Sequence, residues 1–238
     1  MQQKTIAEAG IRLGASHPGP AQHRESDVQR ISAYERFRAR LLSGELKPGQ
    51  FVTQRELAHL AGVPLGAARE AIQQLEHDRL LKVYPQRGIQ VADVTVGALR
   101  DAFEYREILE TYAIRQFAGR VSDAALDALE RGTRGVLARA ANGITRAVQN
   151  EAVEIDWRMH DQIVDSLGNE IVSRNYRVNA ARIRLMRVDN RLSPDRLSAA
   201  LSEHLEVLEA LRARDADRAV DRLRAHLAVA RQRALDGR

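Results

Sequence analysis

Residues 53–91 read TQRELAHLAGVPLGAAREAIQQLEHDRLLKVYPQRGIQV, and the spacing of their apolar side chains changes along the stretch. Residues 57–60 predict a short helix, and Gly62-Val63-Pro64 predict a tight turn after it. Residues 67–75 return to helical spacing and predict a second helix. Two β-prone runs close the unit, over residues 80–84 and 88–91. Helix, turn, helix and hairpin in this order indicate a winged helix-turn-helix.

A winged helix-turn-helix places its second helix in the major groove, so the pattern predicts a DNA duplex as the partner. Arg69 lies on the polar side of the second helix, and Arg55 begins the first helix, where it can reach a phosphate. Arg87-Gly88 forms the hairpin tip, where arginine suits the negative potential of the minor groove. Each arginine alone is also explained as a solvated surface charge. Three at the expected places favour contact with DNA.

Length and charge agree with two domains of which one meets phosphate. The chain has 238 residues, and residues 1–92 carry 13 Lys and Arg against 9 Asp and Glu, a net charge of +4. Residues 93–238 carry 24 against 23, a net charge of +1. The absence of cysteine excludes disulfides and thiolate chemistry. With no long apolar run and no signal-peptide core, we expect a cytoplasmic protein that does not enter a membrane.

The predicted fold class is mainly α, with a winged helix-turn-helix followed by an all-α six-helix bundle. Residues 1–25 contain glycine and proline without helical spacing and predict a flexible tail. Residues 26–92 form the predicted DNA-binding domain, which begins with a helix near Ser26, and residues 93–238 form the bundle. The predicted helices of the bundle are Val96–Ala118, Asp123–Ala141, Gln149–Leu167, Glu170–Asn190, Pro194–Arg214 and Ala216–Leu235.

Three histidines of the bundle, His160, His204 and His226, each fall within an apolar stripe. Asp156 precedes His160 by four residues, so both side chains lie on one helix face. Buried imidazoles and carboxylates need partners. Two interpretations stay open from spacing alone: hydrogen-bonded core histidines, or a divalent metal site built from the three histidines and Asp156.

The first domain resembles the GntR family of bacterial transcription regulators. The shared motifs are GELKPG (44–49), RELA (55–58), REAIQQL (69–75) and RGIQV (87–91). The resemblance implies DNA contacts from Arg55, Arg69 and the Arg87-Gly88 tip. The family's usual base-reading arginine is replaced by Leu65, so its usual operator is not carried over. Here Leu65 and Ala67 could touch thymine methyl groups, with the bare Gly66 backbone against the duplex.

The second domain is similar to the FCD ligand-sensing domain of the FadR subfamily. The matching motifs are Arg106-Glu107-Ile108-Leu109-Glu110, Asp156-x-x-x-His160 followed by Asn169, Glu203-His204 and His226-Leu227. The resemblance implies that Asp156, His160, His204 and His226 bind a divalent metal, with zinc first and nickel or manganese as alternatives. It also implies open coordination positions for a carboxylate effector. Trp157 and Met159 replace more usual neighbours and alter the expected pocket wall.

Arg106 is the first candidate for an effector contact, because it lies in an otherwise apolar helix where a cation can pair with an acid. The alternative is a salt bridge to Glu110, four residues on, and both interpretations stay open. Asn175, Asn179 and Arg184 are further candidates.

Together these features predict a homodimeric, metabolite-responsive repressor of a catabolic operon that reads a palindromic operator and binds a small organic acid beside the metal. One alternative is a metal-dependent enzyme acting on a small carboxylate, with Asp161 or Glu203 as its base. Another is an architectural DNA-binding protein with a purely structural metal. The sequence leaves the effector, the operator and the dimer interface open.

Overall fold

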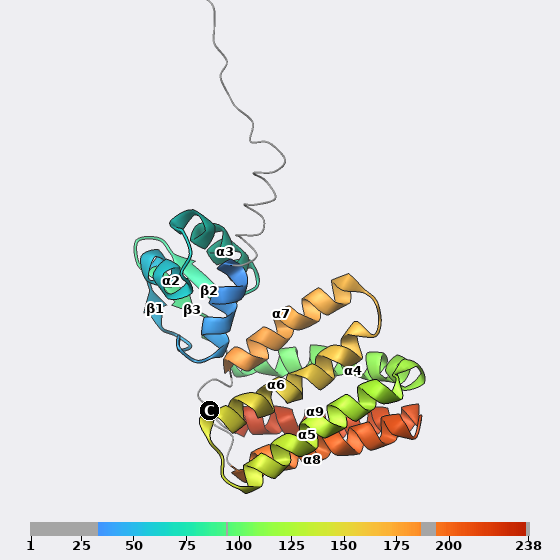
Figure 1. Ribbon diagram of the computed structural model, residues 1–238. Helices are drawn as coiled ribbons and strands as arrows, with labels where there is room; N and C mark the ends of the chain where they lie inside the picture. Colours follow the sequence, from blue (N-terminus) through green and yellow to red (C-terminus); the bar gives the residue numbers. More distant parts are fainter. Residues whose placement is uncertain (1–32, 94, 187–193, 237–238) are drawn as a thin grey trace, which may run out of the picture.

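The computed structural model describes residues 33–93, 95–186 and 194–236, and the predicted tail over residues 1–25 lies outside them. A first helix covers residues 33–42. The winged unit then consists of β1 (Phe51–Val52), α2 (Gln54–Ala61), α3 (Leu65–His77), β2 (Leu81–Tyr84) and β3 (Gly88–Val91). The second half consists of α4 (Val96–Arg120), α5 (Asp123–Ala141), α6 (Arg146–Asp165), α7 (Glu170–Met186), α8 (Pro194–Arg212) and α9 (Ala216–Asp236) (Figure 1). The predicted mainly α class, a winged helix-turn-helix followed by helices, is confirmed.

The winged unit is held together by local signals and by one strand that the sequence prediction missed. Thr53 caps α2 in a reciprocal capping box with Glu56. Gly62 ends the same helix in the left-handed conformation that glycine adopts without steric cost. The missed strand is β1, which has only two residues and pairs antiparallel with β3, giving the sheet order β1-β3-β2. A two-residue strand has no alternation to detect.

The helices of the second half start where a side chain can cap them. Thr95, Ser122 and Thr145 each accept a hydrogen bond from the backbone of the first turn. Because Thr145 is the cap, α6 begins at Arg146, three residues before its predicted start. The predicted end of α4 at Ala118, before Gly119, is wrong by two residues, since the helix continues to Arg120.

The predicted helix ends differ from the observed ones elsewhere by a few residues. Gly143 and Gly168 do follow helix ends, with φ angles of +124° and +64°. Helix α6 ends at Asp165 and α8 at Arg212, each two residues before the prediction. The predicted end of α7 at Asn190 lies outside the described ranges.

Two apolar clusters mark the two halves, and α7 contributes to both. On one side, Tyr176 and Ile183 are buried among the other helices of the second half. On the other, Ala181 and Leu185 join the apolar cluster of the winged unit. The Arg182 Nε atom also donates a 2.9 Å hydrogen bond to the backbone oxygen of Asp78. Helix α7 therefore connects the winged unit to the bundle.

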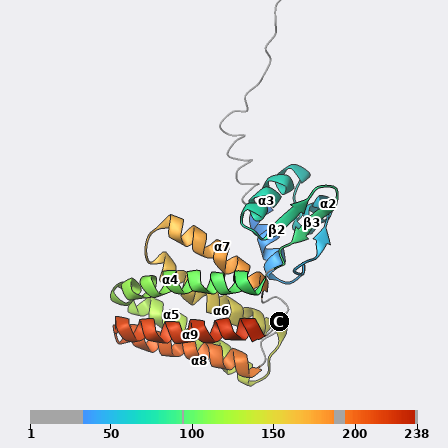
Figure 2. The ribbon, with the colours of Figure 1, turned by 180° about the vertical axis from the view of Figure 1, so that it is seen from behind.

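Helix α4 lies between α7 and α9 on the face shown in Figure 2. It also contacts α6 and α8, so it meets four neighbouring helices. Within the described ranges, no helix combines the length and apolar character needed to cross a membrane.

Candidate metal centre and nucleic-acid interface

Four potential metal ligands converge from three helices of the bundle. Asp156 and His160 come from α6, His204 from α8 and His226 from α9. One ligand atom from each residue lies within 4.8 Å of the others. The His204 Nε2 atom is 3.2 Å from Asp156 Oδ1 and 3.2 Å from His226 Nε2. The three histidines are buried, whereas 19% of the Asp156 side chain remains accessible. The structure thus brings together all four residues singled out in the sequence.

Two further carboxylates orient two of these imidazoles. Glu110 Oε2 lies 2.6 Å from His160 Nδ1, and Glu203 Oε2 lies 2.8 Å from His226 Nδ1. A carboxylate only accepts, so each Nδ1 carries the hydrogen and each Nε2 keeps a lone pair. Such a carboxylate–histidine pair fixes the tautomer of a metal-binding imidazole and increases its basicity.

The atoms left over from these contacts fit a divalent metal. His160 Nε2 is buried without a hydrogen-bond partner among the described protein atoms. The His226 Nε2 atom also carries no hydrogen, and its recorded polar contact is another imidazole nitrogen, His204 Nε2. Three imidazoles and one carboxylate suit zinc and the neighbouring divalent transition metals. The residues present therefore fit the metal that the family resemblance implies.

The protonation states also favour metal binding. Burial, with the nearby His204, lowers the pKa of His226 to about 3. Burial, with the nearby Arg106 charge, lowers the pKa of His160. Burial alone would raise the pKa of Asp156, but its hydrogen bond with His204 and the surrounding imidazoles hold it well below its usual range. Near neutral pH His160 and His226 are therefore neutral and Asp156 is ionised, the forms that bind metal.

Arg106 forms the salt bridge to Glu110 that was one of its two predicted roles. One of its nitrogen atoms still has no hydrogen-bond partner among the described residues. Its Nε atom pairs with Glu110 Oε1 at 2.5 Å, and the Tyr176 hydroxyl donates to the same oxygen at 2.8 Å. Burial alone would raise the pKa of Glu110, but Arg106 and His160 lower it to about 2. The guanidinium lies 4.6 Å from the Trp157 ring centre, and its Nη2 atom has no hydrogen-bond partner among the described residues. The salt bridge and an available donor coexist.

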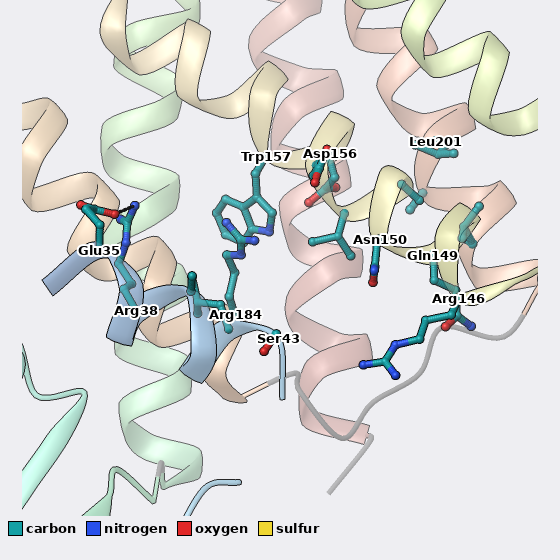
Figure 3. A pocket seen from close by; sticks show the side chains of 17 residues that line it. Glu35, Arg38, Ser43, Arg146, Gln149, Asn150, Asp156, Trp157, Arg184 and Leu201 are labelled. Atoms are coloured by element: carbon teal, nitrogen blue, oxygen red, sulfur yellow. Dashed lines mark ion pairs between the residues drawn. The ribbon is translucent and has the colours of Figure 1, made fainter. Parts of the chain in front are cut away.

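A cavity of about 520 Å³ reaches the metal cluster at Asp156. Its wall includes Trp157 of α6 and Arg184 of α7, together with residues of the first helix and of α8 (Figure 3). The Arg184 guanidinium lies 5.7 Å from the Trp157 ring centre. Of the four effector candidates, Arg184 is the one that lines this cavity.

The two asparagines among the effector candidates do not line this cavity. Asn175 and Asn179 line a different cavity of about 900 Å³, between the winged unit, α4 and α7. Asn179 Nδ2 donates to the backbone oxygen of Ala102 at 2.8 Å. Successive residues of a helix turn by about 100°, so positions 175 and 179 share a face that Arg184 does not.

The supporting residues Glu110, Glu203 and Tyr176 were not predicted in these roles. The spacing of Glu110 indicated only a partner for Arg106, and Glu203 precedes His204 but serves His226 on another helix. Nothing in the sequence pointed to Tyr176, whose contact spans 66 residues. Such pairings depend on how the helices pack.

The predicted DNA-contacting residues are mostly exposed on the winged unit. Arg55 and Arg69 are exposed and form no hydrogen bond or ion pair with the described residues. Leu65 is 46% exposed, and a Cβ added at Gly66 would meet nothing within 4 Å. Ala67 is half-buried and packs against the apolar cluster of the unit, so less of it is available for contact.

The hairpin tip has a structural reason for its glycine. Gly88 has a φ of +102°, and a Cβ there would approach the backbone oxygen of Val52 to 3.1 Å. This close approach belongs to the β1–β3 pairing, which places the hairpin beside the start of α2. Gln54 Nε2 donates to the backbone oxygen of Leu65 at 3.2 Å and joins the starts of α2 and α3. Arg87 is exposed, with its guanidinium 5.9 Å from the Phe51 ring centre.

A winged helix-turn-helix joined to an all-helical domain is the organisation of a DNA-binding regulator. Comparison with known families agrees. The FCD domain matches residues 101–229, and the family of bacterial regulatory proteins called gntR matches residues 30–91. The chain therefore belongs to the GntR family of transcriptional regulators, in the group that carries an FCD domain.

Individual relatives and solved structures share this organisation. The chain is 27% identical to the transcriptional repressor RspR of Escherichia coli over 180 residues, which cover 74% of the chain and 75% of RspR. It is 23% identical to the uncharacterised regulator YdhC of Bacillus subtilis, over 82% of the chain and 86% of YdhC. The solved structure of E. coli McbR/YncC superposes with a TM-score of 0.72 at 19% identity, covering 86% of this chain and 97% of McbR/YncC. These names and domains indicate a transcriptional regulator.

Proposed function

We propose that this regulator is a homodimeric, metabolite-responsive repressor of the FadR subfamily, and that its helical domain binds a small organic acid at a divalent metal. The observation that carries the proposal is the convergence of Asp156, His160, His204 and His226 within 4.8 Å at the end of an accessible cavity. Zinc suits the three imidazoles and one carboxylate, and nickel or manganese remain compatible with them. A repressor role is supported by the likeness to RspR.

A bound metal supplies a Lewis-acidic position that accepts a carboxylate oxygen of the effector. The protein's own groups then orient that acid. Arg106 offers a buried Nη2 donor next to Trp157, and Arg184 offers a guanidinium on the cavity wall. Charge-assisted hydrogen bonds from arginine to carboxylate are about twice as strong as neutral ones.

On the DNA side, we infer that Arg69 reads a base edge or a phosphate in the major groove, and that Arg55 contacts the adjacent backbone. The Arg87-Gly88 tip follows the minor groove. Leu65 and Gly66 are exposed at the start of α3, so they present an apolar surface suited to thymine methyl groups. Ala67 adds its exposed part to the same contact. A dimer would present two such units to a palindromic operator.

Communication between the two sites needs an element that both sites touch. Helix α7 carries Tyr176, which holds Glu110 of the metal surroundings, and Leu185, which is buried in the winged unit. An effector that binds one arrangement of α7 more tightly than another changes operator affinity by the ratio of the two affinities.

The proposal is tested by measuring the metal content of the purified protein and its fluorescence anisotropy on DNA from its own upstream region. We expect about one metal per chain, and salt-sensitive binding that is roughly a thousandfold tighter than to scrambled DNA. Carboxylic acids are then screened for release of that DNA. Turnover of a bound acid would indicate the enzyme instead, and equal binding to both duplexes would indicate an architectural protein.

A further inference from the structure

We propose that the effector carries two anionic groups, one held at the metal cluster and the other by Arg38 and Arg184, so that it bridges the sensor domain and the DNA-binding domain. This inference rests on the proposed function and narrows the chemical class of its effector. A dicarboxylate or a phosphorylated acid has the required form.

The cavity is built by both domains. Arg38 comes from the helix over residues 33–42, which packs in the apolar cluster of the winged unit. Asp156 and Trp157 come from α6, Arg184 from α7, and Leu201 from α8 (Figure 3). A ligand of metabolite size fits in about 520 Å³ and would touch all of these elements.

Positive charge at this cavity is only partly compensated. Arg184 is half-buried and has no hydrogen bond or ion pair with the described residues; its recorded partner is the Trp157 ring. Burial, with the nearby Arg38 charge, lowers the pKa of Arg184, although the carboxylates of Asp161, Asp156 and Glu154 act in the opposite direction. An anion in the cavity would relieve this cost.

Two further arginines and two glutamates also line the cavity. Arg38 forms a 2.7 Å ion pair with Glu35, and that carboxylate is about half exposed. Arg146, at the start of α6, is exposed and unpaired among the described residues. Glu154 is the remaining acid of the wall and is exposed. With Asp156 engaged by the metal, the arginines outnumber the acids that can oppose them.

The separation of the two ends sets the ligand class. Asp156 marks the end at the metal cluster, and Arg38 lies on the opposite, winged-unit wall of the same cavity (Figure 3). An acid with a single carboxylate can satisfy only one end. An acid with two anionic groups satisfies both, and its affinity then depends on how the two domains are placed. That dependence couples the ligand to DNA binding in addition to the connection through α7.

The test uses the full-length, metal-loaded protein and isothermal titration with butyrate, succinate, glutarate, adipate and 3-phosphoglycerate. The variants are Arg38→Gln and Arg184→Gln. Arg40→Gln is the matched control, since Arg40 lies on the same helix as Arg38, also pairs with a glutamate, and does not line the cavity. Operator affinity is measured in parallel, with and without saturating acid.

We expect at least one acid with two anionic groups to bind more tightly than butyrate. Arg38→Gln and Arg184→Gln should each weaken that binding by about tenfold, the size of a lost charge-assisted hydrogen bond, and leave metal binding unchanged. Arg38→Gln should also leave butyrate binding unchanged. Arg38→Gln should also reduce the effect of the acid on operator affinity. The dicarboxylate and phosphorylated arms distinguish which second anion is preferred.

Two results overturn the inference in different ways. If acids bind and change operator affinity but Arg38→Gln behaves like Arg40→Gln, the bridging inference fails and the proposed function stands. If none of the acids binds the metal-loaded protein, the bridging inference fails together with the organic-acid part of the proposed function.

Discussion

The two halves of this regulator place their polar groups in opposite ways. Among the described residues, all the buried polar and charged side chains lie in the helical half, whereas the buried side chains of the winged unit are apolar. The winged unit keeps Arg55 and Arg69 exposed. The helical half hides Arg106, Glu110 and His160 with at most 1% exposure.

This difference follows from what each half has to recognise. A duplex is larger than the domain that reads it, so its contacts must lie on the surface, where unpaired cations stay hydrated until the duplex arrives. A small-molecule effector must be surrounded, so its contacts lie inside, where every charge needs a partner in the absence of ligand. The ion pair of Arg106 with Glu110 and the Tyr176 hydroxyl supply those partners.

The largest expected effect breaks the buried network of the helical half. Glu110→Gln removes the charge that opposes buried Arg106, and should lower the free energy of unfolding by about 3–5 kcal/mol. Urea unfolding of chelator-treated protein, followed by the fluorescence of Trp157, the single tryptophan of the chain, measures it. Glu107→Gln is the control, since Glu107 is 41% exposed on the same helix. Equal effects from both would contradict the buried network.

The next largest effect concerns the carboxylate that orients one of the predicted metal ligands. Glu203→Gln removes the acceptor that orients His226, and should weaken metal binding by about ten- to a hundredfold. Competition with a chromophoric chelator measures the affinity. Glu206→Gln is the control, because Glu206 is 54% exposed on the same helix and pairs with Arg222. If Glu203→Gln left the metal affinity unchanged, Glu203 would have no role in metal binding.

On the winged unit, the corresponding loss should appear in DNA binding alone. Arg69→Ala should weaken operator binding by about 1–3 kcal/mol and relax specificity at one position if it reads a base, or lower the salt dependence by about one ion if it binds phosphate. Anisotropy at several salt concentrations distinguishes the two. Stability should not change, because Arg69 is exposed. Arg120→Ala, at the exposed end of α4, serves as control; a similar loss there would indicate a nonspecific charge effect.

The smallest effect is a pH dependence of the helical half. Burial, with His204 nearby, lowers the native pKa of His226 to about 3, whereas an unfolded histidine titrates near about 6.5. Below that value the unfolded chain binds a proton that the native state refuses, so stability falls as pH falls. For His226 alone the loss should reach about 1.4 kcal/mol between about pH 7.5 and about pH 5.5. Trp157 fluorescence in urea, without metal, measures it.

His226→Asn should remove that part of the pH dependence and leave the contribution of His160, whose pKa is also lowered by burial. Stability that rises on acidification would show that His226 is stabilised in its protonated form in the native state.

The two halves also differ in how far their sequences could be interpreted. In the winged unit the capping box of Thr53 and Glu56, the turn at Gly62 and the hairpin are formed by neighbours in the chain, so their spacing predicts them. Only β1, which exists through its pairing with β3, was missed. In the helical half, periodicity predicted the helices but placed the end of α4 at Ala118, whereas the helix continues to Arg120.

The sequence by itself determined the order of the elements apart from β1, the family and, through the family resemblance, the four residues that the structure gathers in one cluster, because helix periodicity and short motifs are local properties of the chain. Only the tertiary structure decided that Glu110 orients His160, that Glu203 orients His226, and that Arg184 but not Asn175 lines the cavity beside Asp156. These outcomes depend on the rotation of each helix about its axis and on contacts between residues tens of positions apart. Apolar spacing fixes the buried face of a helix, but not which partner that face meets.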